Sequence, residues 1–323
     1  MRQPSPILSI IMPMHNVAAW VGPAIRSILD QTWRDLELII VDDCSDDASG
    51  RIAEAACHGD ARVRFVRQPR QQGQSAARNR GLELACGSYI YLFDSDDLLE
   101  PDTLATCMQR IKQDDLDFVT FSGTAFDDET GAAIQAREFR KPNLPMPQPG
   151  QDLFVALLRQ KSFSSSCCLY VFARSLLDET ALHFDEGYLH EDEAFTTILY
   201  CTSHRSIAMS APFFRRRFRS GSTMTKPRGL SNVSGCVKAA TRLAEYRRRC
   251  GESLSQACHQ ALRRRQKSVM RQATINALLC RNSVQLLTML LGQIGLRQIA
   301  RIDPLLPAFY GWCLLQRAFG RLR

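Results

Sequence analysis

The sequence predicts an α/β fold in which a mainly parallel, Rossmann-like sheet is flanked by helices. Three observations predict it: short apolar runs recur along residues 7–121, helical patterns separate them, and two acidic runs stand directly after strands. Alternating strands and helices favour right-handed crossovers between parallel strands. In such sheets ligands bind beyond the carboxyl ends of the strands, so the two acidic runs mark the expected binding edge.

Each element follows from a local pattern. Apolar runs of four to six residues predict buried strands at 7–12, 36–41, 63–66, 89–93 and 118–121. Apolar residues at helical spacing predict helices at 21–28, 52–57, 75–84, 101–111, 152–158 and 191–199. The proline-rich stretch 127–150 is expected to be a loop, residues 206–218 are expected to be extended, and the pattern after Lys226 is helical to the end.

The charge of the chain changes near Lys226, where the helical pattern of the last part begins. The net charge is +8, but residues 226–323 hold 18 Lys and Arg against 3 Asp and Glu, a net of +15, whereas residues 1–225 have a net of −7. We therefore expect a catalytic domain at 1–225 and a basic helical region at 226–323. A strongly basic segment favours an anionic neighbour.

The cysteines and the apolar stretches indicate in which cellular compartment the protein is expected. The 12 cysteines form no C-x-x-C pair, so zinc knuckles are not expected and reduced thiols in a cytoplasmic protein are the simpler reading. The first residues lack the layout of a signal peptide. The longest apolar stretch, about 286–296, is shorter than the roughly 20 residues that a membrane span needs.

The run Asp94-Ser95-Asp96 follows the fourth predicted strand and is the first candidate site. Two carboxylates two residues apart on a turn can aim at one point, and Mg²⁺ or Mn²⁺ prefers carboxylate oxygen. A divalent cation neutralises a nucleotide diphosphate before it leaves. The alternative is that both acids only cap the following turn and helix.

Asp42 and Asp43 follow the second strand and are candidates to accept a hydrogen bond from a base N–H or a ribose hydroxyl; the alternative is turn formation. Arg78 lies near the start of a helix, where a phosphate or a pyrimidine edge would suit it, or it is a solvated surface arginine. Asp192 is the candidate general base, although three acids in a first turn also complement the helix dipole.

Several segments, in order, resemble the family 2 group of inverting glycosyltransferases, which have the GT-A fold. The resemblance covers residues 7–225 and is carried by 9–16 (SIIMPMHN), 38–47 (LIIVDDCSDD), Gly73, 77–81 (ARNRG), 91–97 (YLFDSDD), 184–187 (FDEG), 191–195 (EDEAF) and 219–222 (RSGS).

The resemblance implies roles for the matching positions. Pro13 and the Asp42-Asp43 pair would frame the nucleotide base. Apart from these roles, Asn16, Arg78 and Ser95 are further candidates for the nucleotide-sugar site. Asp94 would contact the ribose or the metal, Asp96 would hold the metal, and Asp192 would be the base. The nucleotide-sugar half would be about 1–122 and the acceptor half about 123–225.

Two positions depart from the family pattern. His15 stands where the family usually has Tyr, and Cys44 where Gly is frequent. If this position has a positive φ, Cys44 is mildly strained.

The tail has three candidate partners. Basic patches at 247–249 and 263–271, and an amphipathic segment at 305–323, suggest helices lying on an anionic membrane at the inner face of the plasma membrane. A helical cap on the catalytic domain is the alternative. Nucleic acid is not expected, because few aromatic residues are available to stack on bases.

The expected function is transfer of a sugar with inversion, as in the hexosyltransferases (EC 2.4), from a nucleotide-diphosphate sugar to a hydroxyl of a glycan or lipid-linked acceptor in surface polysaccharide synthesis. The resemblance favours a UDP-sugar and a divalent metal, Mn²⁺ or Mg²⁺. One rival is a sugar nucleotidyltransferase, but residues 13–16 lack the glycine that its phosphate loop needs. The other is a non-catalytic binding protein, against which the intact acids argue.

Overall fold

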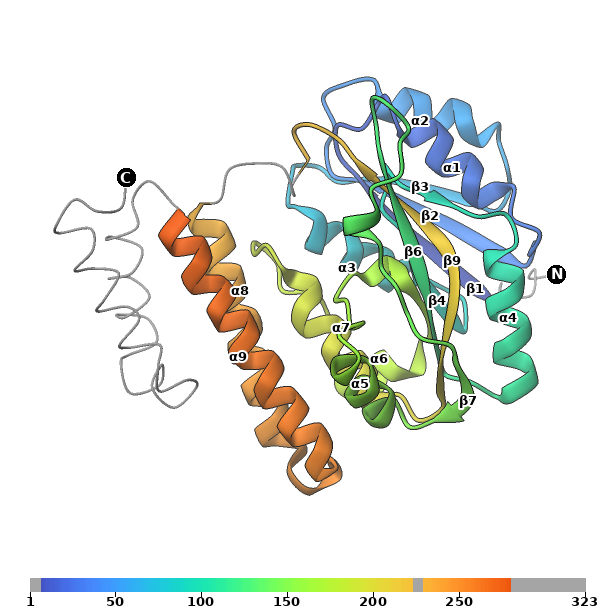
Figure 1. Cartoon of the computed structure of the whole chain (residues 1–323). Helices are drawn as coiled ribbons and strands as arrows, with labels where there is room; N and C mark the ends of the chain where they lie inside the picture. Colours follow the sequence, from blue (N-terminus) through green and yellow to red (C-terminus); the bar gives the residue numbers. More distant parts are fainter. Residues whose placement is uncertain (1–6, 223–228, 280–323) are drawn as a thin grey trace, which may run out of the picture. The chain divides into compact units, whose positions relative to one another are not determined.

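The computed structural model describes residues 7–222 and 229–279 (Figure 1). Contacts divide the chain into two units, which we call the sheet unit (Met1–Gly187 with Phe195–Thr225) and the helical unit (Tyr188–Ala194 with Lys226–Arg323). The short stretch 188–194 therefore belongs to the helical unit, although the sequence on both sides of it belongs to the sheet unit.

The described residues of the sheet unit form a nine-stranded sheet with the order β3-β2-β1-β4-β8-β6-β9-β5, and β7 pairs with β9. The strands are β1 (Leu8–Met14), β2 (Leu36–Asp42), β3 (Val63–Arg67), β4 (Tyr89–Leu92), β5 (Leu98–Leu99), β6 (Phe118–Asp127), β7 (Leu144–Gln148), β8 (Tyr170–Ala173) and β9 (Ser206–Phe218). The helices before the hairpin are α1 (Val21–Leu29), α2 (Ser49–Cys57), α3 (Gln74–Leu84), α4 (Thr103–Asp114), α5 (Gly150–Arg159), α6 (Ser175–Thr180) and α7 (Glu191–Thr202). The first residues of α7, up to Ala194, belong to the helical unit. Short 3₁₀ turns are η1 (Gln135–Arg137) and η2 (Cys167–Leu169).

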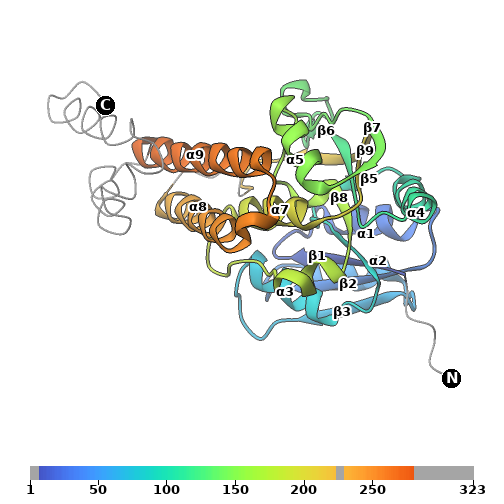
Figure 2. The ribbon, with the colours of Figure 1, turned by 90° about the horizontal axis from the view of Figure 1, so that it is seen from below.

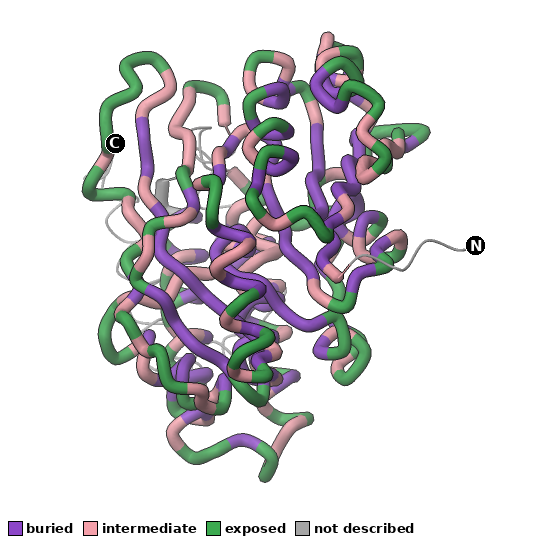
Figure 3. Tube along the Cα trace, turned by 90° about the vertical axis from the view of Figure 1, so that its right-hand side faces the viewer, coloured by how far each residue is buried: buried purple, intermediate pink, exposed green. Residues whose placement is uncertain are grey.

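The parallel part of the sheet confirms the prediction. Strands β3, β2, β1 and β4 are neighbours and all parallel, and β1, β2 and β3 lie side by side in Figure 2. All seven residues of β1 are buried, as are six of the seven in β2. In Figure 3 buried residues form long continuous stretches of the trace. A strand covered on both faces needs a continuous apolar run, and this is the signal that the sequence carries.

The other part of the sheet is mixed. Strand β8 is antiparallel to both β4 and β6, whereas β9 is parallel to β6. The stretch 127–150, expected to be a loop, contains η1 and β7. Within residues 7–222 and 229–279, strand β7 pairs only with β9, so its Pro145 and Pro147 are tolerated as they are at sheet edges.

This topology brings several strand ends to one edge. Because β8 is antiparallel to both of its neighbours, β4 and β6 point the same way, and β1, β2 and β9 run parallel to them. The carboxyl ends of β1, β2, β4, β6 and β9 therefore meet at one edge, which we call the carboxyl edge.

The helical unit contains a helical hairpin of α8 (Leu230–Cys250), the turn η3 (Gly251–Ser253) and α9 (Gln256–Leu279). Buried apolar residues pack the two helices together, among them Cys236, Leu243, Leu262 and Val269. The predicted helical character after Lys226 is confirmed for the described residues. The expected membrane segment at 305–323 and the apolar stretch at 286–296 lie outside them. Across the described part of the chain, no helix combines the length and hydropathy required to span a bilayer.

Candidate active site

The structure places the predicted acids at the carboxyl edge of the sheet. Asp42 is the last residue of β2, and the acidic loop, residues 94–97, begins two residues after β4 ends. Strand β6 ends in Asp127 beside Asp128, and Arg217 lies at the end of β9, with Arg219 just beyond it. Acidic and basic side chains from four strands thus share one edge.

Asp94 is held from the N-terminal half of α3. Its Oδ1 accepts hydrogen bonds from Arg78 Nη2 at 2.8 Å and from Gln74 Nε2 at 3.0 Å. The Arg78 side chain is 4 % exposed, and its guanidinium lies 5.2 Å from the centre of the Phe184 ring. Arg78 is therefore a buried partner of the acidic loop and not the solvated arginine of the alternative reading.

Asp96 and Asp97 are held from the end of β9. Arg219 Nε donates to Asp96 Oδ2 at 2.9 Å, and Arg217 Nε donates to the Asp96 carbonyl oxygen at 2.7 Å. The Arg217 backbone N–H donates to Asp97 Oδ1 at 2.7 Å. The acidic loop is thereby fixed by residues more than a hundred positions away in the sequence.

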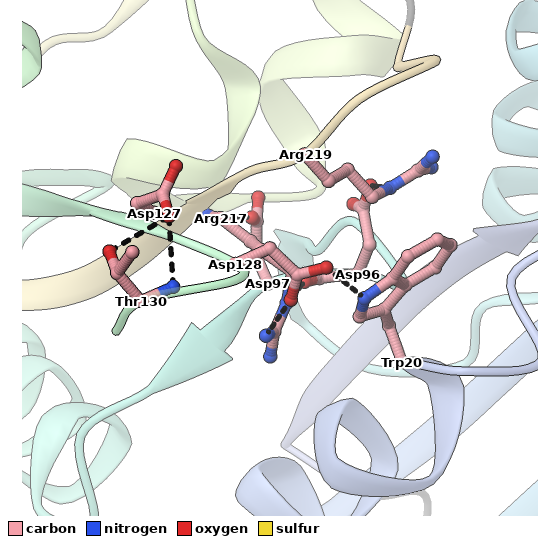
Figure 4. A network of polar contacts seen from close by, with 8 residues as sticks. All are labelled: Trp20, Asp96, Asp97, Asp127, Asp128, Thr130, Arg217 and Arg219. Atoms are coloured by element: carbon pink, nitrogen blue, oxygen red, sulfur yellow. Dashed lines mark hydrogen bonds and ion pairs between the residues drawn. The ribbon is translucent and has the colours of Figure 1, made fainter. Parts of the chain in front are cut away.

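Trp20 and Asp128 extend this network, as Figure 4 shows. Asp128 accepts from Arg217 Nη1 at 2.7 Å and from Trp20 Nε1 at 2.9 Å. The Arg219 guanidinium lies over the Trp20 ring, 4.1 Å from its centre, a geometry for cation–π attraction. The indole and the carboxylate therefore fix the orientation of both arginines.

The three carboxyl groups of the acidic loop perturb one another. Burial raises the pKa of Asp96, and the negative charge of Asp94 raises it further, although Arg219 opposes both. Burial and the charges of Asp96 and Asp94 raise the pKa of Asp97 well above its usual range. Burial also acts to raise the pKa of Asp94, but the charge and hydrogen bond of Arg78, together with the charge of Arg216 and a hydrogen bond from Cys168, lower the pKa overall.

A divalent cation of the kind the resemblance implies fits this loop. Asp94 and Asp96 offer hard carboxylate oxygens, and a bound cation would relieve the repulsion that raises the pKa of Asp96. No cluster of three or more potential metal ligands occurs within 7–222 and 229–279. Mg²⁺ commonly completes its coordination with phosphate oxygens and water.

The end of β2 forms a second polar centre. Asp42 Oδ1 accepts from the Ser45 backbone N–H at 2.9 Å and from its hydroxyl at 2.5 Å, while Oδ2 is buried without a hydrogen bond, 3.7 Å from Arg67 Nε. Asp43 accepts from the backbone N–H groups of Gln72 and Gly73, both at 2.7 Å. Asp43 thus fixes the loop that leads into α3, a role that the sequence did not reveal.

The remaining candidates near β1 and β4 have local roles. Pro13 lies in β1 opposite Val41. Asn16 exchanges hydrogen bonds with Asp46: its Nδ2 donates to Asp46 Oδ1 at 2.7 Å, and its Oδ1 accepts from the Asp46 N–H at 3.1 Å. Ser95 is buried within the acidic loop. The expected strain at Cys44 is confirmed, because its φ is 59°.

Asn79 joins two motifs that lie far apart in the sequence. Its Nδ2 donates to the Phe184 carbonyl at 3.0 Å, and its Oδ1 accepts from the Phe184 N–H at 2.9 Å. The Phe184 ring stacks on Phe195 of α7, with ring centres 3.9 Å apart. Asn79 and Arg219 both stand in motifs of the resemblance, so a signal for them existed, whereas nothing singled out Trp20 or Asp128.

Asp192 lies in the first turn of α7, with Glu191 and Glu193 beside it. This turn belongs to the helical unit, whereas the other predicted site residues belong to the sheet unit. Within the helical unit, Glu193 forms an ion pair with Arg265 of α9.

The helical unit also holds a hollow of about 650 Å³ where α8 turns into α9. Burial and the charge of Arg263 lower the pKa of Arg247, and neither arginine forms an ion pair within the described part of the chain. The hollow is lined by Arg247, Gly251, Glu252, Leu254, Gln256, His259, Gln260 and Arg263.

Known proteins with similar sequences include glycosyltransferases. Glycosyltransferase GlyG of Streptococcus pneumoniae is 28% identical over 253 residues, which cover 73% of this chain and 82% of that protein. The uncharacterized glycosyltransferase EpsJ of Bacillus subtilis is 33% identical over 203 residues, covering 62% of this chain and 58% of its own length.

Solved structures share the fold. TarS 1-349 of S. aureus in complex with UDP-GlcNAc aligns with a TM-score of 0.61 at 16% identity, covering 93% of this chain and 91% of that one. The mannosyltransferase PcManGT from Pyrobaculum calidifontis, in complex with GDP-Man and Mn²⁺, aligns with a TM-score of 0.53 at 14% identity, covering 99% and 89%. These likenesses show a GT-A-like fold.

The sequence model of one family, "Glycosyl transferase family 2", matches residues 9–180. The match includes the ends of β2 and β4 and all of α3, and it ends before Asp192 and Arg219. Since it spans more than half of the chain, the protein belongs to glycosyl transferase family 2.

Proposed function

We propose that this glycosyltransferase transfers a sugar with inversion from a nucleotide-diphosphate sugar to a hydroxyl of a glycan or lipid-linked acceptor. UDP is the proposed nucleotide, since TarS is solved with UDP-GlcNAc and with UDP. The acidic loop carries the proposal: two carboxylates stand at the carboxyl edge, each oriented by a buried or half-buried arginine. Such an arrangement suits a metal-bound diphosphate.

Asp94 and Asp96 would hold the divalent metal, Mn²⁺ or Mg²⁺. When bound, the metal neutralises the charge that develops on the leaving diphosphate. Arg78 and Arg219 keep the two carboxylates in position through their hydrogen bonds. Asp42, the last residue of β2, is the proposed acceptor of a hydrogen bond from the nucleotide base or the ribose. Pro13, Asn16, Asp43 and Ser95 would shape this side of the site.

Asp192 would take the proton from the acceptor hydroxyl as that oxygen attacks the anomeric carbon and the nucleotide diphosphate departs. Direct displacement by one nucleophile inverts the configuration at that carbon. A sugar nucleotidyltransferase would use its carboxylates for metal but needs no base on an acceptor sugar. A binding protein on the same scaffold would need no turnover at all.

Two variants separate these functions. We expect Asp96→Ala to lose metal-dependent UDP binding, measured by calorimetry with and without Mn²⁺, whereas Glu54→Gln, an exposed acid on α2, leaves binding unchanged. We expect Asp192→Asn to keep UDP binding and to lose transfer, measured as nucleotide release across a panel of UDP- and GDP-sugars. Full transfer by Asp192→Asn removes the base role, and UDP binding by Asp96→Ala that still depends on Mn²⁺ removes the metal role.

We also propose that the helical unit meets an anionic membrane surface on the cytoplasmic side, where a lipid-linked acceptor would be presented. Support comes from the net charge of +15 over residues 226–323 and from the arginines beside the hollow at the α8–α9 turn. Arg247 and Arg263 lie close enough for one charge to lower the pKa of the other. An anionic headgroup between them would remove this repulsion.

A further inference from the structure

The stretch 188–194 carries Asp192 and lies between two segments of the sheet unit in the sequence, yet it belongs to the helical unit. A helix that starts in a polar loop can fray over its first turn, because its first four N–H groups have no partner within the helix. A general base needs a fixed position within hydrogen-bond reach of its proton. A base at Asp192 therefore requires contacts that fix the first turn of α7.

Helix α8 contacts the residues just before Asp192. Gly235 is buried, and a Cβ atom there would lie 1.8 Å from the Leu189 carbonyl oxygen and 2.7 Å from the Leu189 carbonyl carbon. Only a glycine permits this approach, since the atoms that would clash are backbone atoms. One turn further along the same face, Lys238 Nζ lies 5.8 Å from the centre of the Tyr188 ring.

Helix α9 contacts the residue just after Asp192. Arg265 Nη2 donates to Glu193 Oε2 in an ion pair whose side chains are 18 % and 17 % exposed. A half-buried ion pair of this kind restrains its partners more than an exposed pair does, because solvent screens it less. Asp192 is thus bracketed: Leu189 is held by α8 and Glu193 by α9.

The two helices of the hairpin are packed on each other. They share a buried apolar seam, and Asn276 of α9 reaches α8, where its Nδ2 donates to the Asn232 carbonyl at 3.5 Å and to Cys236 Sγ at 3.7 Å. Movement of either helix would carry the bracketed turn with it.

We infer that the α8–α9 hairpin is a positioning element for catalysis, in which Gly235 and Arg265 fix the turn that bears Asp192. The inference rests on the proposed role of Asp192 as the base. It assigns a catalytic purpose to a part of the chain that lies outside the family match.

The test uses the full chain and compares neighbouring arginines. We expect Arg265→Ala to lower kcat by roughly 10- to 100-fold, the size of loss that a misplaced catalytic group produces, while the Kd for UDP with Mn²⁺ stays within about twofold. Arg264→Ala, an exposed neighbour on α9, is the control and is expected to keep its kcat. A charge exchange, Glu193→Arg with Arg265→Glu, should recover part of the kcat that Arg265→Ala loses.

A purely structural role would give a different pattern. If Arg265 only stabilised the fold, its variant would lower the thermal unfolding midpoint while folded enzyme kept its kcat, and that result overturns the inference. An equal loss of UDP binding and kcat overturns it too. The base role is judged separately. If the Asp192→Asn variant is active, Asp192 is not the base. If Asp192→Asn is inactive and Arg265→Ala is fully active, only the positioning role of Arg265 is contradicted.

The Gly235→Ala variant tests the contact between Gly235 and the Leu189 backbone independently of Arg265. The added methyl would push against the Leu189 backbone, so we expect kcat to fall while UDP binding is kept, and Ser234→Ala, the residue before it, serves as the control. Normal turnover by a folded Gly235→Ala variant would contradict a positioning role for α8.

Discussion

Asp96 and Arg219 form a pair whose strength depends on a third side chain, because the Arg219 guanidinium also lies over the Trp20 ring. Removing the guanidinium deprives Asp96 of a hydrogen bond and of the positive charge that opposes the rise in its pKa. We expect Arg219→Ala to weaken Mn²⁺-dependent UDP binding by about tenfold, as the loss of a partner behind a metal ligand commonly does.

The loss of UDP binding in Arg219→Ala should depend on pH, because the variant changes the pKa of Asp96. Without Arg219 the pKa of Asp96 rises further, so protons compete with the metal more strongly as the pH falls. The ratio of wild-type to Arg219→Ala affinity should therefore be larger at pH 6 than at pH 8, measured by calorimetry. Arg51→Ala, an exposed arginine on α2, should show neither effect. A ratio that stays constant with pH would contradict the electrostatic role.

Lys141 is a buried amine that is not part of the acidic loop. Burial lowers its pKa to about 7, and its Nζ donates to the Ser162 carbonyl at 3.0 Å. In the unfolded chain its pKa returns to about 10.4, so between these values the unfolded state binds one more proton and folding stability rises with pH. The charged form penalises the folded state fully below pH 7.

Lys141→Met removes this titration. We expect the variant to be more stable relative to the wild type at pH 7 than at pH 9, the difference changing by up to ~1.4 kcal/mol per pH unit. Urea unfolding at pH 7, 8 and 9 measures it. A difference that does not vary with pH means that Lys141 keeps its ordinary pKa.

At the residue scale, sequence reasoning located the acids but not their partners. Asp42, Asp43, Asp94 and Asp96 were predictable because they directly follow buried strands. Arg219 and Asp96 are 123 positions apart, and only the pairing of β9 with β6 at the carboxyl edge brings them together. Local pattern contains no information about such pairs.

At the scale of elements, α3 links the fold to the site, because Gln74 and Arg78 near its start hold Asp94 and Gly81 packs on β1. A Cβ atom at Gly81 would lie 2.3 Å from Ile11 Cγ2. Ile11 is fully buried and β-branched, so it has no freedom to turn away. The glycine of the 77–81 motif is therefore required for close packing of the helix on the sheet.

We expect Gly81→Ala to destabilise the sheet unit by ~1–3 kcal/mol through overpacking, even though alanine favours helix by ~1 kcal/mol over glycine. Thermal and urea unfolding measure the change, and Arg80→Ala, exposed on the same helix, is the control. A stabilised Gly81→Ala variant would show that helix propensity outweighs packing here.

Elements with a clear periodic signal were predictable, and those defined by their neighbours were not. Strands β1 to β4 and β6 appear as apolar runs. Strand β8 has only four residues and follows directly on η2, and β7 contains two prolines that argue against a strand. Both are defined by their pairing: β8 lies between β4 and β6, and β7 pairs with β9.

At the scale of the whole molecule, contacts group residues into two units that do not follow the order of the sequence. The charge change near residue 226 was visible in the sequence, but the assignment of residues 188–194 to the helical unit was not. It depends on Gly235, Lys238 and Arg265, which lie some 45 to 75 positions further on. The proposed division into nucleotide-sugar and acceptor halves stays a prediction.

The basic helical unit leads to the last prediction, for the full chain. The arginines beside the hollow repel one another, and an anionic surface would relieve this repulsion at ~1 kcal/mol per basic residue close to it. We expect the protein to float with vesicles containing phosphatidylglycerol and not with neutral phosphatidylcholine vesicles, and we expect binding to weaken as salt rises.

The double variant Arg247→Gln with Arg263→Gln should reduce flotation by roughly tenfold or more, because two basic contacts are lost. Its control is Arg51→Gln with Arg64→Gln, which removes two exposed charges from the sheet unit and leaves the net charge of the two variants equal. Equal flotation of both variants would show that net charge alone attracts the protein to the vesicle. Loss confined to the first variant would place the membrane-facing surface at the α8–α9 turn, which is part of the hairpin that we propose positions the base.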